Sequence, residues 1–340
     1  MTEDEVQGWA GTRRWVEGTL APGERIAGVR ALKGGWTSQM RRLDIESVNS
    51  DSSDDGNHDN SGNGDNGRDG SGRYSLVLRS FVKPFYVRHA PGMLEREADV
   101  LRLLAARDIP AARLRAVDAR GEHGEHPSLL MTHLDGGVRV QEDGDVARRV
   151  ELLARQLAAV HTVEVDEEQR PRAWQAWTSP ERVQVPPATE RPELWERAVT
   201  LIGRPAPEHR GAFLHRDFHP GNVLFDGTGA ELAVSGVVDW VETSWGPTDL
   251  DVAHCSTALA LLHGVETGLA FADAYERAGG TLTATGEDHL YWRLLDALAF
   301  APDAEKVAVP WRELGRTDLS TQLLSARLEE YVAALFERYA

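Results

Sequence analysis

The feature that most constrains the fold is the spacing of a few polar residues between positions 213 and 239. The tripeptide His-Arg-Asp stands at positions 215–217, and Asn222 follows five residues after the aspartate. Downstream, the apolar segment 234–238 is typical of a buried strand, and it ends on Asp239. The pattern H-R-D-x-x-x-x-N followed by an aspartate at a strand end is typical of a site for phosphoryl transfer.

The chemistry of phosphoryl transfer explains this spacing. One carboxylate must orient the attacking hydroxyl and accept its proton, while an amide oxygen and a second carboxylate hold Mg²⁺ on the triphosphate. A loop places the first two side chains together, and the hairpin that follows brings the third beside them. Taken alone, Asp217 and Asn222 could instead cap a turn at Pro220-Gly221.

The stretch HRDFHPGNVLFDG…VSGVVDWVETSWGPTDLDVAH resembles the signature of the aminoglycoside phosphotransferase family of small-molecule kinases. The resemblance implies an α+β, protein-kinase-like bilobal fold: a small N-lobe with an antiparallel sheet and one helix, and a larger, mainly helical C-lobe. It implies that Asp217 is the catalytic base and that Asn222 and Asp239 bind Mg²⁺. It further implies that His219 and Gly221 shape the loop.

Two positions near this signature extend the resemblance. Arg216 stands where the family commonly has glycine, a variant that protein kinases share and that should not harm the chemistry. Asp251 would brace the catalytic loop rather than take part in the reaction, although it could also cap the helix that begins near Val252.

The same resemblance places a phosphate clamp in the N-lobe. Arg79 ends the segment Leu-Val-Leu-Arg, where the family has the basic residue that contacts the α- and β-phosphates. An arginine there is permanently charged and can bind phosphate in a bidentate manner. Glu97 matches the helix glutamate that pairs with this residue. The alternatives are an arginine that faces water at a strand end and an ordinary helix-surface glutamate.

Two further segments would contact the nucleotide. Gly34 and Gly35 lie between strand-like segments, where glycine lets backbone N–H groups approach phosphates closely. Met131 and His133 match the segment that joins the lobes, whose backbone would meet the adenine edge. The alternatives are an ordinary turn at the glycines and a buried strand end at Met131 and His133.

Residues 49–73 consist almost entirely of Asp, Asn, Ser and Gly. Such a segment cannot bury enough apolar surface to offset its ordering entropy, so we predict that it is disordered. The flanking segments 39–45 and 74–82 have the patterns of strands, which predicts a hairpin with an expanded turn. Loop-closure entropy grows slowly with length, so the fold can tolerate the insertion.

The rest of the chain divides into two parts. Apolar periodicity predicts a helix over 93–106, a strand over 128–134 and a helix over 146–161 with Asp145 as its N-cap. After residue 247 the pattern is mainly helical, with helices expected over 248–265, 267–278, 287–300 and 319–339. We therefore expect a nucleotide-binding N-lobe over 1–134 and a C-lobe over 135–340 that carries the catalytic loop and the substrate-binding helices.

Composition excludes several classes of function. The formal net charge of −17 disfavours nucleic-acid binding and would suit a cationic small molecule. Cys255 is the only cysteine, which excludes an internal disulfide framework. The N-terminus lacks the apolar core of a signal peptide, and no apolar run is long enough to span a bilayer. We therefore expect a cytoplasmic protein without a membrane partner.

The sequence thus predicts a kinase that uses ATP or GTP and Mg²⁺ to phosphorylate a hydroxyl of a small molecule, with aminoglycosides and other amine- or sugar-like compounds as candidates. One alternative is a metal-dependent hydrolase that uses His215, Asp217 and His219 as ligands. Another is a non-catalytic nucleotide-binding protein of kinase-like fold. Three tryptophans, which could stack on a sugar or simply pack, precede the catalytic loop: Trp174, Trp177 and Trp195.

Overall fold

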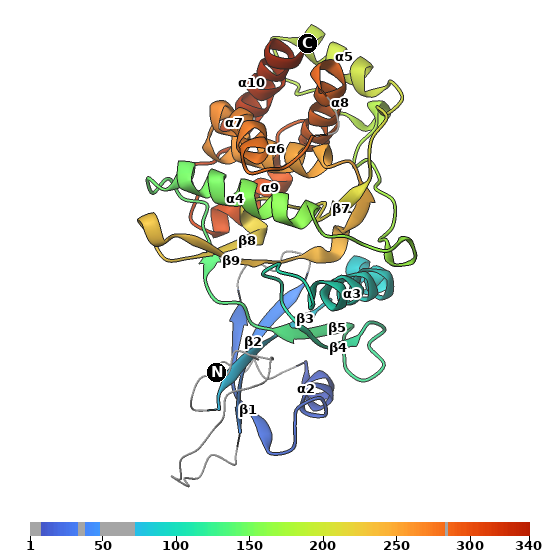
Figure 1. Ribbon diagram of the computed structural model, residues 1–340, viewed down its shortest axis with the longest axis vertical. Helices are drawn as coiled ribbons and strands as arrows, with labels where there is room; N and C mark the ends of the chain where they lie inside the picture. The colour runs from blue at the N-terminus through green and yellow to red at the C-terminus, as the bar shows by residue number, and fades with distance from the viewer. Residues whose placement is uncertain (1–7, 33–37, 48–71, 283–284) are drawn as a thin grey trace. The chain divides into compact units, whose positions relative to one another are not determined.

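The computed structural model describes residues 8–32, 38–47, 72–282 and 285–340 (Figure 1). The chain divides into two compact units. Unit 1 comprises Met1–Ala106 and Ala112–Leu134, and unit 2 comprises Arg107–Ala111 and Asp135–Ala340. The described residues do not include Gly34, Gly35 and nearly all of segment 49–73. The predictions made for these residues therefore fall outside the described part of the chain.

Unit 1 is built on an antiparallel sheet with the strand order β1-β2-β3-β5-β4. Its apolar core lies between the sheet and α2 and includes Trp9, Val16, Leu43 and Leu76. The elements are α2 (Ala10–Glu17), β1 (Glu24–Leu32), β2 (Gln39–Ser47), β3 (Tyr74–Ser80), α3 (Pro84–Leu104), β4 (Leu114–Asp118) and β5 (Ser128–Thr132). The predicted hairpin is confirmed, because β2 pairs with β3 from Gln39↔Ser80 to Ile45↔Tyr74.

The helices of unit 1 differ from the expectation in two ways. First, α3 begins at Pro84 and not at residue 93. Its interior contains Pro91, which removes one helical hydrogen bond without ending the helix. Second, unit 1 has the additional helix α2, whose first amides donate to Glu125, more than a hundred residues along the chain. No capping residue near α2 in the sequence indicates where this helix begins, so the sequence pattern did not predict it.

Unit 2 combines helices with two small antiparallel sheets of order β10-β7 and β6-β8-β9. Its strands are β6 (Gly137–Val138), β7 (Ala212–Leu214), β8 (Val223–Asp226), β9 (Ala233–Val237) and β10 (Ser244–Gly246). Its α-helices are α4 (Val146–His161), α5 (Pro192–Ile202), α6 (Asp249–His263), α7 (Val265–Arg277), α8 (Gly286–Ala297), α9 (Glu305–Glu313) and α10 (Thr321–Tyr339). Short 3-10 helices span Glu167–Gln169, Pro180–Arg182, Pro220–Asn222, Gly229–Glu231, Trp240–Glu242 and Leu298–Phe300.

The predicted helices of unit 2 are confirmed within a few residues, and α4 matches its predicted range of 146–161. Asp145 stands at the N-cap position of α4, as predicted, but its side chain makes no capping bond to the helix and its carboxylate accepts from Gly229 N instead. The sequence pattern missed α9, which is short and contains Pro310.

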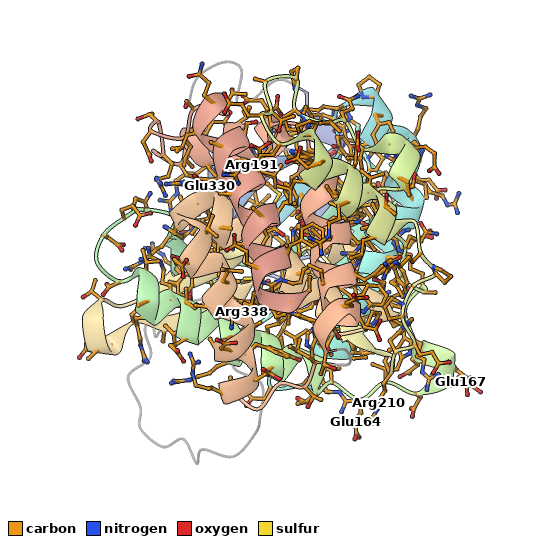
Figure 2. The ribbon with its side chains drawn as sticks, turned by 90° about the horizontal axis from the view of Figure 1, so that it is seen from above. Glu164, Glu167, Arg191, Arg210, Glu330 and Arg338 are labelled. Atoms are coloured by element: carbon orange, nitrogen blue, oxygen red, sulfur yellow. The ribbon has the colours of Figure 1, made fainter. Side chains whose placement is uncertain are left out.

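Helix α6 forms the centre of unit 2. It packs against α7, α8 and α10, and all but one of its residues are buried (Figure 1). A helix that is apolar on every side belongs inside a core, so its few polar residues need partners there. Asp249, Asp251 and His254 are among these residues. Charged side chains lie on the outside of the unit, for example Arg191, Glu330 and Arg338 (Figure 2).

No helix of the described residues is long and apolar enough to cross a membrane.

Candidate active site

The loop after β7 brings the predicted catalytic residues together. The chain leaves β7 at Leu214, passes through the 3-10 helix Pro220–Asn222 and enters β8. Val223 pairs with Val237, so Asn222 and Asp239 lie at the same end of the β8–β9 pair. A bond from Val238 N to Asn222 O (3.0 Å) extends this pairing beyond the strands. The loop and the hairpin therefore bring Asp217, Asn222 and Asp239 into one region.

The backbone of this loop is fixed by Asp251 on α6. Its Oδ2 accepts from His215 N and its Oδ1 from Arg216 N, both at 2.8 Å. The expected bracing role of Asp251 is thus confirmed. Arg216 has φ +75°, the left-handed conformation that favours glycine. Its guanidinium lies 4.2 Å from the ring centre of Trp177.

His215 serves the loop backbone and is not a ligand. Its Nε2 lies 3.0 Å from Val238 O, and its Nδ1 accepts from Asp217 N at 3.2 Å. Burial lowers the pKa of His215, so the ring is neutral. Because backbone groups occupy both ring nitrogens, the predicted metal cluster of His215, Asp217 and His219 does not form. The hypothesis of a metal-dependent hydrolase that uses these three residues as ligands is therefore wrong.

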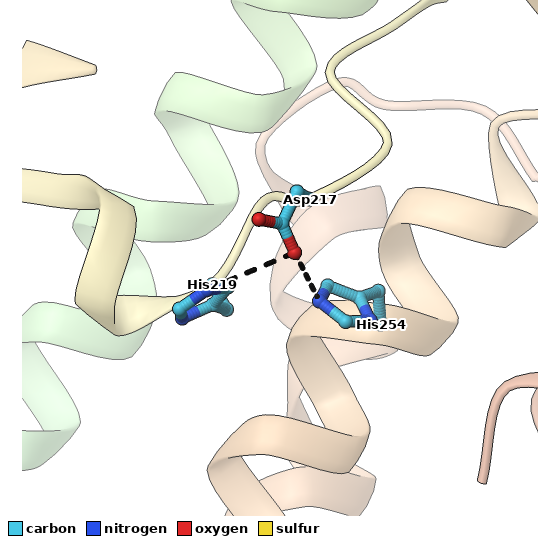
Figure 3. A group of neighbouring side chains, drawn as sticks. All are labelled: Asp217, His219 and His254. Carbon is cyan, nitrogen blue, oxygen red and sulfur yellow. Dashed lines mark hydrogen bonds and ion pairs between the residues drawn. The ribbon is translucent and has the colours of Figure 1, made fainter. Parts of the chain in front are cut away.

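Asp217 is held through both of its carboxylate oxygens. Oδ1 lies 3.1 Å from His254 Nε2 (Figure 3). Oδ2 accepts from Asn222 Nδ2 at 3.0 Å. Its side chain is nevertheless 30% exposed. Burial alone would raise the pKa of Asp217, but the hydrogen bond from His254 and the nearby positive charge hold this pKa far below its usual range. The carboxylate is therefore ionised and fixed in direction.

His254 is the residue that sequence reasoning missed. It lies on α6, and its Nδ1 is 3.0 Å from Asp296 Oδ1, so the ring bridges two carboxylates. Burial opposes its protonation, but Asp296 and Asp217 together raise the pKa of His254 to about 9. It is an imidazolium at neutral pH. The sequence signal that could have identified His254 is a histidine inside a largely apolar helix. Its partner Asp296 on α8 lies 42 residues further along the chain, so no local pattern connects the two.

The triad Asp217, His219 and His254 has ligand atoms within 4.8 Å of one another. However, His254 carries a proton on each nitrogen when it bridges two carboxylates, which leaves no lone pair for a metal. His219 uses Nδ1 to accept from Gly221 N at 3.0 Å, the loop-shaping role expected of it. Burial lowers the pKa of His219 to about 4. The triad therefore consists of the ion pair between Asp217 and His254 with a neutral His219 beside it, and it does not suit a metal.

Asn222 and Asp239 offer the donors that Mg²⁺ prefers. The side-chain nitrogen of Asn222 donates to Asp217 O (2.9 Å) and to its Oδ2, which fixes the amide and leaves its oxygen as the acceptor atom. Asp239 follows β9 with φ +66°, a left-handed conformation that is costly for a non-glycine residue and is found mainly at functional positions. An amide oxygen and a carboxylate are hard donors suited to Mg²⁺.

A pocket of about 140 Å³ opens beside Asp217. It is lined by Trp177, Asp217, His219, His254, Ala258, Phe300, Lys306, Val307 and Trp311, all of unit 2. Of the three tryptophans singled out in the sequence, Trp177 alone is among these lining residues. Trp195 is fully buried and donates to Glu329 (2.8 Å), and Trp174 packs edge-on against Trp292.

The predicted ion pair of Arg79 and Glu97 in unit 1 forms, while its contact with phosphate stays a prediction. Arg79 Nη1 on β3 lies 3.0 Å from both carboxylate oxygens of Glu97 on α3. The side chains are 5% and 2% exposed, so Arg79 is not a strand-end residue that faces water. Burial holds the ion pair in an environment of low dielectric constant, where it is strong.

Met131 and His133 lie in and just after β5. Met131 pairs with Val77 on one side and Leu114 on the other, and His133 N donates to Ser75 O at 3.1 Å. This stretch is thus tied into the sheet of unit 1. Its contact with an adenine edge stays a prediction.

Comparisons with known proteins also indicate a phosphotransferase. The model of the phosphotransferase enzyme family matches residues 66–298, more than half of the chain. A candidate aminoglycoside phosphotransferase of Ralstonia eutropha JMP134 is 16% identical, with 96% of each chain covered and a TM-score of 0.59. Macrolide 2'-phosphotransferase type I is 17% identical, with 100% of this chain and 98% of that chain covered and a TM-score of 0.54.

A thermostable mutant of aminoglycoside phosphotransferase APH(4)-Ia, in a ternary complex with AMP-PNP and hygromycin B, is 14% identical; 97% of this chain and 99% of that chain are covered, with a TM-score of 0.58. No curated protein sequence matches the chain. At these identities the structures establish the kinase-like α+β fold, and the family model establishes the family. The chain belongs to the phosphotransferase enzyme family, and it is a small-molecule kinase that acts on a hydroxyl group.

Proposed function

We propose that this enzyme transfers the γ-phosphoryl group of ATP or GTP, with Mg²⁺, to a hydroxyl of a small molecule bound in the pocket of unit 2. The observation that carries the proposal is the placement of Asp217. Its ionised carboxylate lies in the pocket wall, and both of its oxygens are held by neighbouring side chains. A fixed carboxylate at the wall of a pocket can direct a hydroxyl toward a phosphorus atom.

Asp217 would accept a hydrogen bond from the acceptor hydroxyl and so aim its oxygen for in-line attack. The new bond forms between this oxygen and the γ-phosphorus, the bond to the β-phosphate oxygen breaks, and the nucleoside diphosphate leaves with the electron pair. The hydroxyl proton passes to Asp217. A carboxylate of lowered pKa is a weak base, so it orients the hydroxyl first and takes the proton late, as a loose transition state allows.

The metal and phosphate contacts follow from the same assignment. Asn222, through its amide oxygen, and Asp239, through its carboxylate, would hold Mg²⁺. When bound, Mg²⁺ neutralises charge on the phosphate oxygens. In unit 1, Arg79 would bind the phosphates that are not transferred, while Glu97 holds the guanidinium in place. Unit 1 would thus serve the nucleotide, and unit 2 the acceptor and the chemistry.

Product analysis tests this function. The full chain is incubated with Mg-ATP or Mg-GTP and with sugars, amino alcohols, aminoglycosides, macrolides and uncharged or acidic alcohols. We expect nucleoside diphosphate in equal amount to an acceptor that has gained one phosphoryl group, detected by mass spectrometry. Chelation of Mg²⁺ should stop the reaction, and renewed Mg²⁺ should restore it. Nucleotide hydrolysis that yields inorganic phosphate with every acceptor would contradict the proposal.

A further inference from the structure

The acceptor pocket is small and has aromatic walls. Trp177, Phe300 and Trp311 contribute rings, and Ala258 and Val307 add apolar surface. An apolar cavity of about 150 Å³ accommodates one benzene ring. The pocket of about 140 Å³ therefore has room for one six-membered ring beside Asp217.

Protein cations already lie over two of these rings. The Lys306 ammonium is 4.7 Å from the ring centre of Phe300, and the Arg216 guanidinium is 4.2 Å from that of Trp177. An aromatic ring attracts a cation through its negative face. Because Lys306 and Arg216 already make this interaction, a ligand ammonium at these rings would meet like charges.

The carboxylates near the pocket are also engaged. Asp217 is the only carboxylate among the described residues that line it, and its oxygens are held by His254 and Asn222. Asp296 lies behind His254, is 4% exposed and faces the same imidazolium. With Asp217 assigned to the acceptor hydroxyl, the described walls present no second carboxylate for an ammonium group.

Lys306 adds a positive charge at the pocket. Burial lowers the pKa of its ammonium, while the charges of Asp296 and Asp217 act to raise this pKa. The charge of Arg182 acts to lower it, so a further cation lies near. Lys306 donates one N–H to Ala299 O at 2.6 Å, which leaves two donors on the ammonium. These donors suit a carboxylate or another small anionic group.

We propose that the acceptor of this enzyme is a hydroxylated compound with a single flat ring and an anionic group, which Lys306 binds, and that a polyamine is not its preferred substrate class. The inference rests on the proposed function, because the pocket receives an acceptor only if Asp217 serves a hydroxyl. It also changes the expectation of a cationic acceptor drawn from the net charge of −17. The charges that line a pocket act on its ligand from a shorter distance than the rest of the chain does, and Lys306 is a cation in this lining.

Three para-substituted benzyl alcohols test the proposal, because they share the ring and the hydroxyl and differ in charge. They are 4-(hydroxymethyl)benzoate, benzyl alcohol itself and 4-(aminomethyl)benzyl alcohol. Calorimetric titration of the full chain measures the affinity of each. Turnover is measured by incubation with Mg-ATP and detection of the phosphate ester by mass spectrometry, which we call the ester assay. We expect the anionic alcohol to bind tightest and the cationic one weakest, with each step roughly fivefold, as for a partly exposed ion pair.

Variants of Lys306 assign the effect to its charge. Lys306→Gln should remove most of the preference for the anionic alcohol, and Lys306→Glu should reverse the order of the three affinities. Arg191→Gln removes one exposed cation that does not line the pocket, and it should leave the order unchanged. Rescue of binding of the cationic alcohol by Lys306→Glu also shows that the variant is folded.

Three results would overturn the inference: tighter binding of the cationic alcohol by the unmodified protein, an unchanged order in Lys306→Glu, or no measurable binding of all three probes. The ester assay separates this failure from that of the proposed function. If hygromycin B is phosphorylated and the anionic alcohol is not, the kinase function stands and the acceptor inference fails. If no acceptor gives an ester and Mg-ATP does not bind, the proposed function itself fails.

Discussion

His254 lies between the carboxylates of Asp217 and Asp296, which raise its pKa from 6.5 to about 9. Its side chain is 5% exposed, so solvent screens this interaction little. The difference corresponds to roughly 3 kcal/mol in favour of the imidazolium in the folded protein. Because the folded pKa exceeds the unfolded one, this stabilisation is fully present below pH 6.5 and is lost as the pH rises through about 9.

The perturbation is His254→Gln, which removes the charge but keeps a polar side chain of similar length. In NMR titrations of protein with labelled histidines, the resonance missing from this variant should titrate near pH 9. Between pH 6.5 and pH 10, the unfolding free energy of the unmodified protein should fall by about 3 kcal/mol more than that of the variant. Few other basic groups lose a proton in this alkaline range, because only three of the 37 basic residues are lysines: Lys33, Lys83 and Lys306.

His289→Gln is the matched control. His289 is also buried and also bonds a carboxylate of α6, that of Asp249, but burial lowers its pKa. Its resonance should therefore titrate below 6.5, and its removal should leave the alkaline loss of stability intact. A His254 resonance that titrates at or below 6.5, or equal alkaline losses in protein and variant, would refute the ion-pair network that we assign to Asp217.

Three other substitutions have defined outcomes. Glu97→Gln leaves the Arg79 guanidinium buried without its carboxylate; it should cost about 3–5 kcal/mol in denaturant unfolding and weaken nucleotide binding in calorimetry. Asp251→Asn replaces a carboxylate that accepts two loop amides with a side chain that offers one acceptor oxygen, so kcat should fall while the nucleotide Kd stays unchanged. Gly136→Ala should lower the unfolding free energy by more than about 1 kcal/mol, because φ is +90° and the new Cβ would meet Phe225 O at 2.7 Å; unchanged stability would contradict the close approach.

Local sequence patterns sufficed for the parts of the site that are contiguous in the chain. The loop from His215 to Asn222 and the strand before Asp239 lie within 25 residues, and their spacing alone brings them together. The pair Arg79 and Glu97 was predicted through the family resemblance, and the structure contains this ion pair. Helix α4 has a clear apolar periodicity, and its bounds were predicted to the residue.

The parts that depend on distant contacts could not be predicted. The identity of His254 as the partner of Asp217 depends on how α6 packs beneath the loop, and its second partner comes from α8. Helix α2 is capped by a residue 113 positions away, so no local pattern signals it. The presence of Lys306 at the pocket was not predicted for the same reason: it lies on α9, a helix with Pro310 in its interior that the sequence pattern missed.

Asp217→Asn tests the central claim most directly, because it keeps the shape of the side chain and removes its ability to accept the hydroxyl proton. Asp226→Asn, which changes an exposed carboxylate at the end of β8, is the matched control. In single-turnover measurements with Mg-ATP and a common acceptor, we expect the Asp217 variant to be slower by about 10²–10⁴-fold, with nucleotide binding retained and the control unchanged. Turnover within about tenfold of the unmodified protein would contradict the assignment of Asp217 as the base.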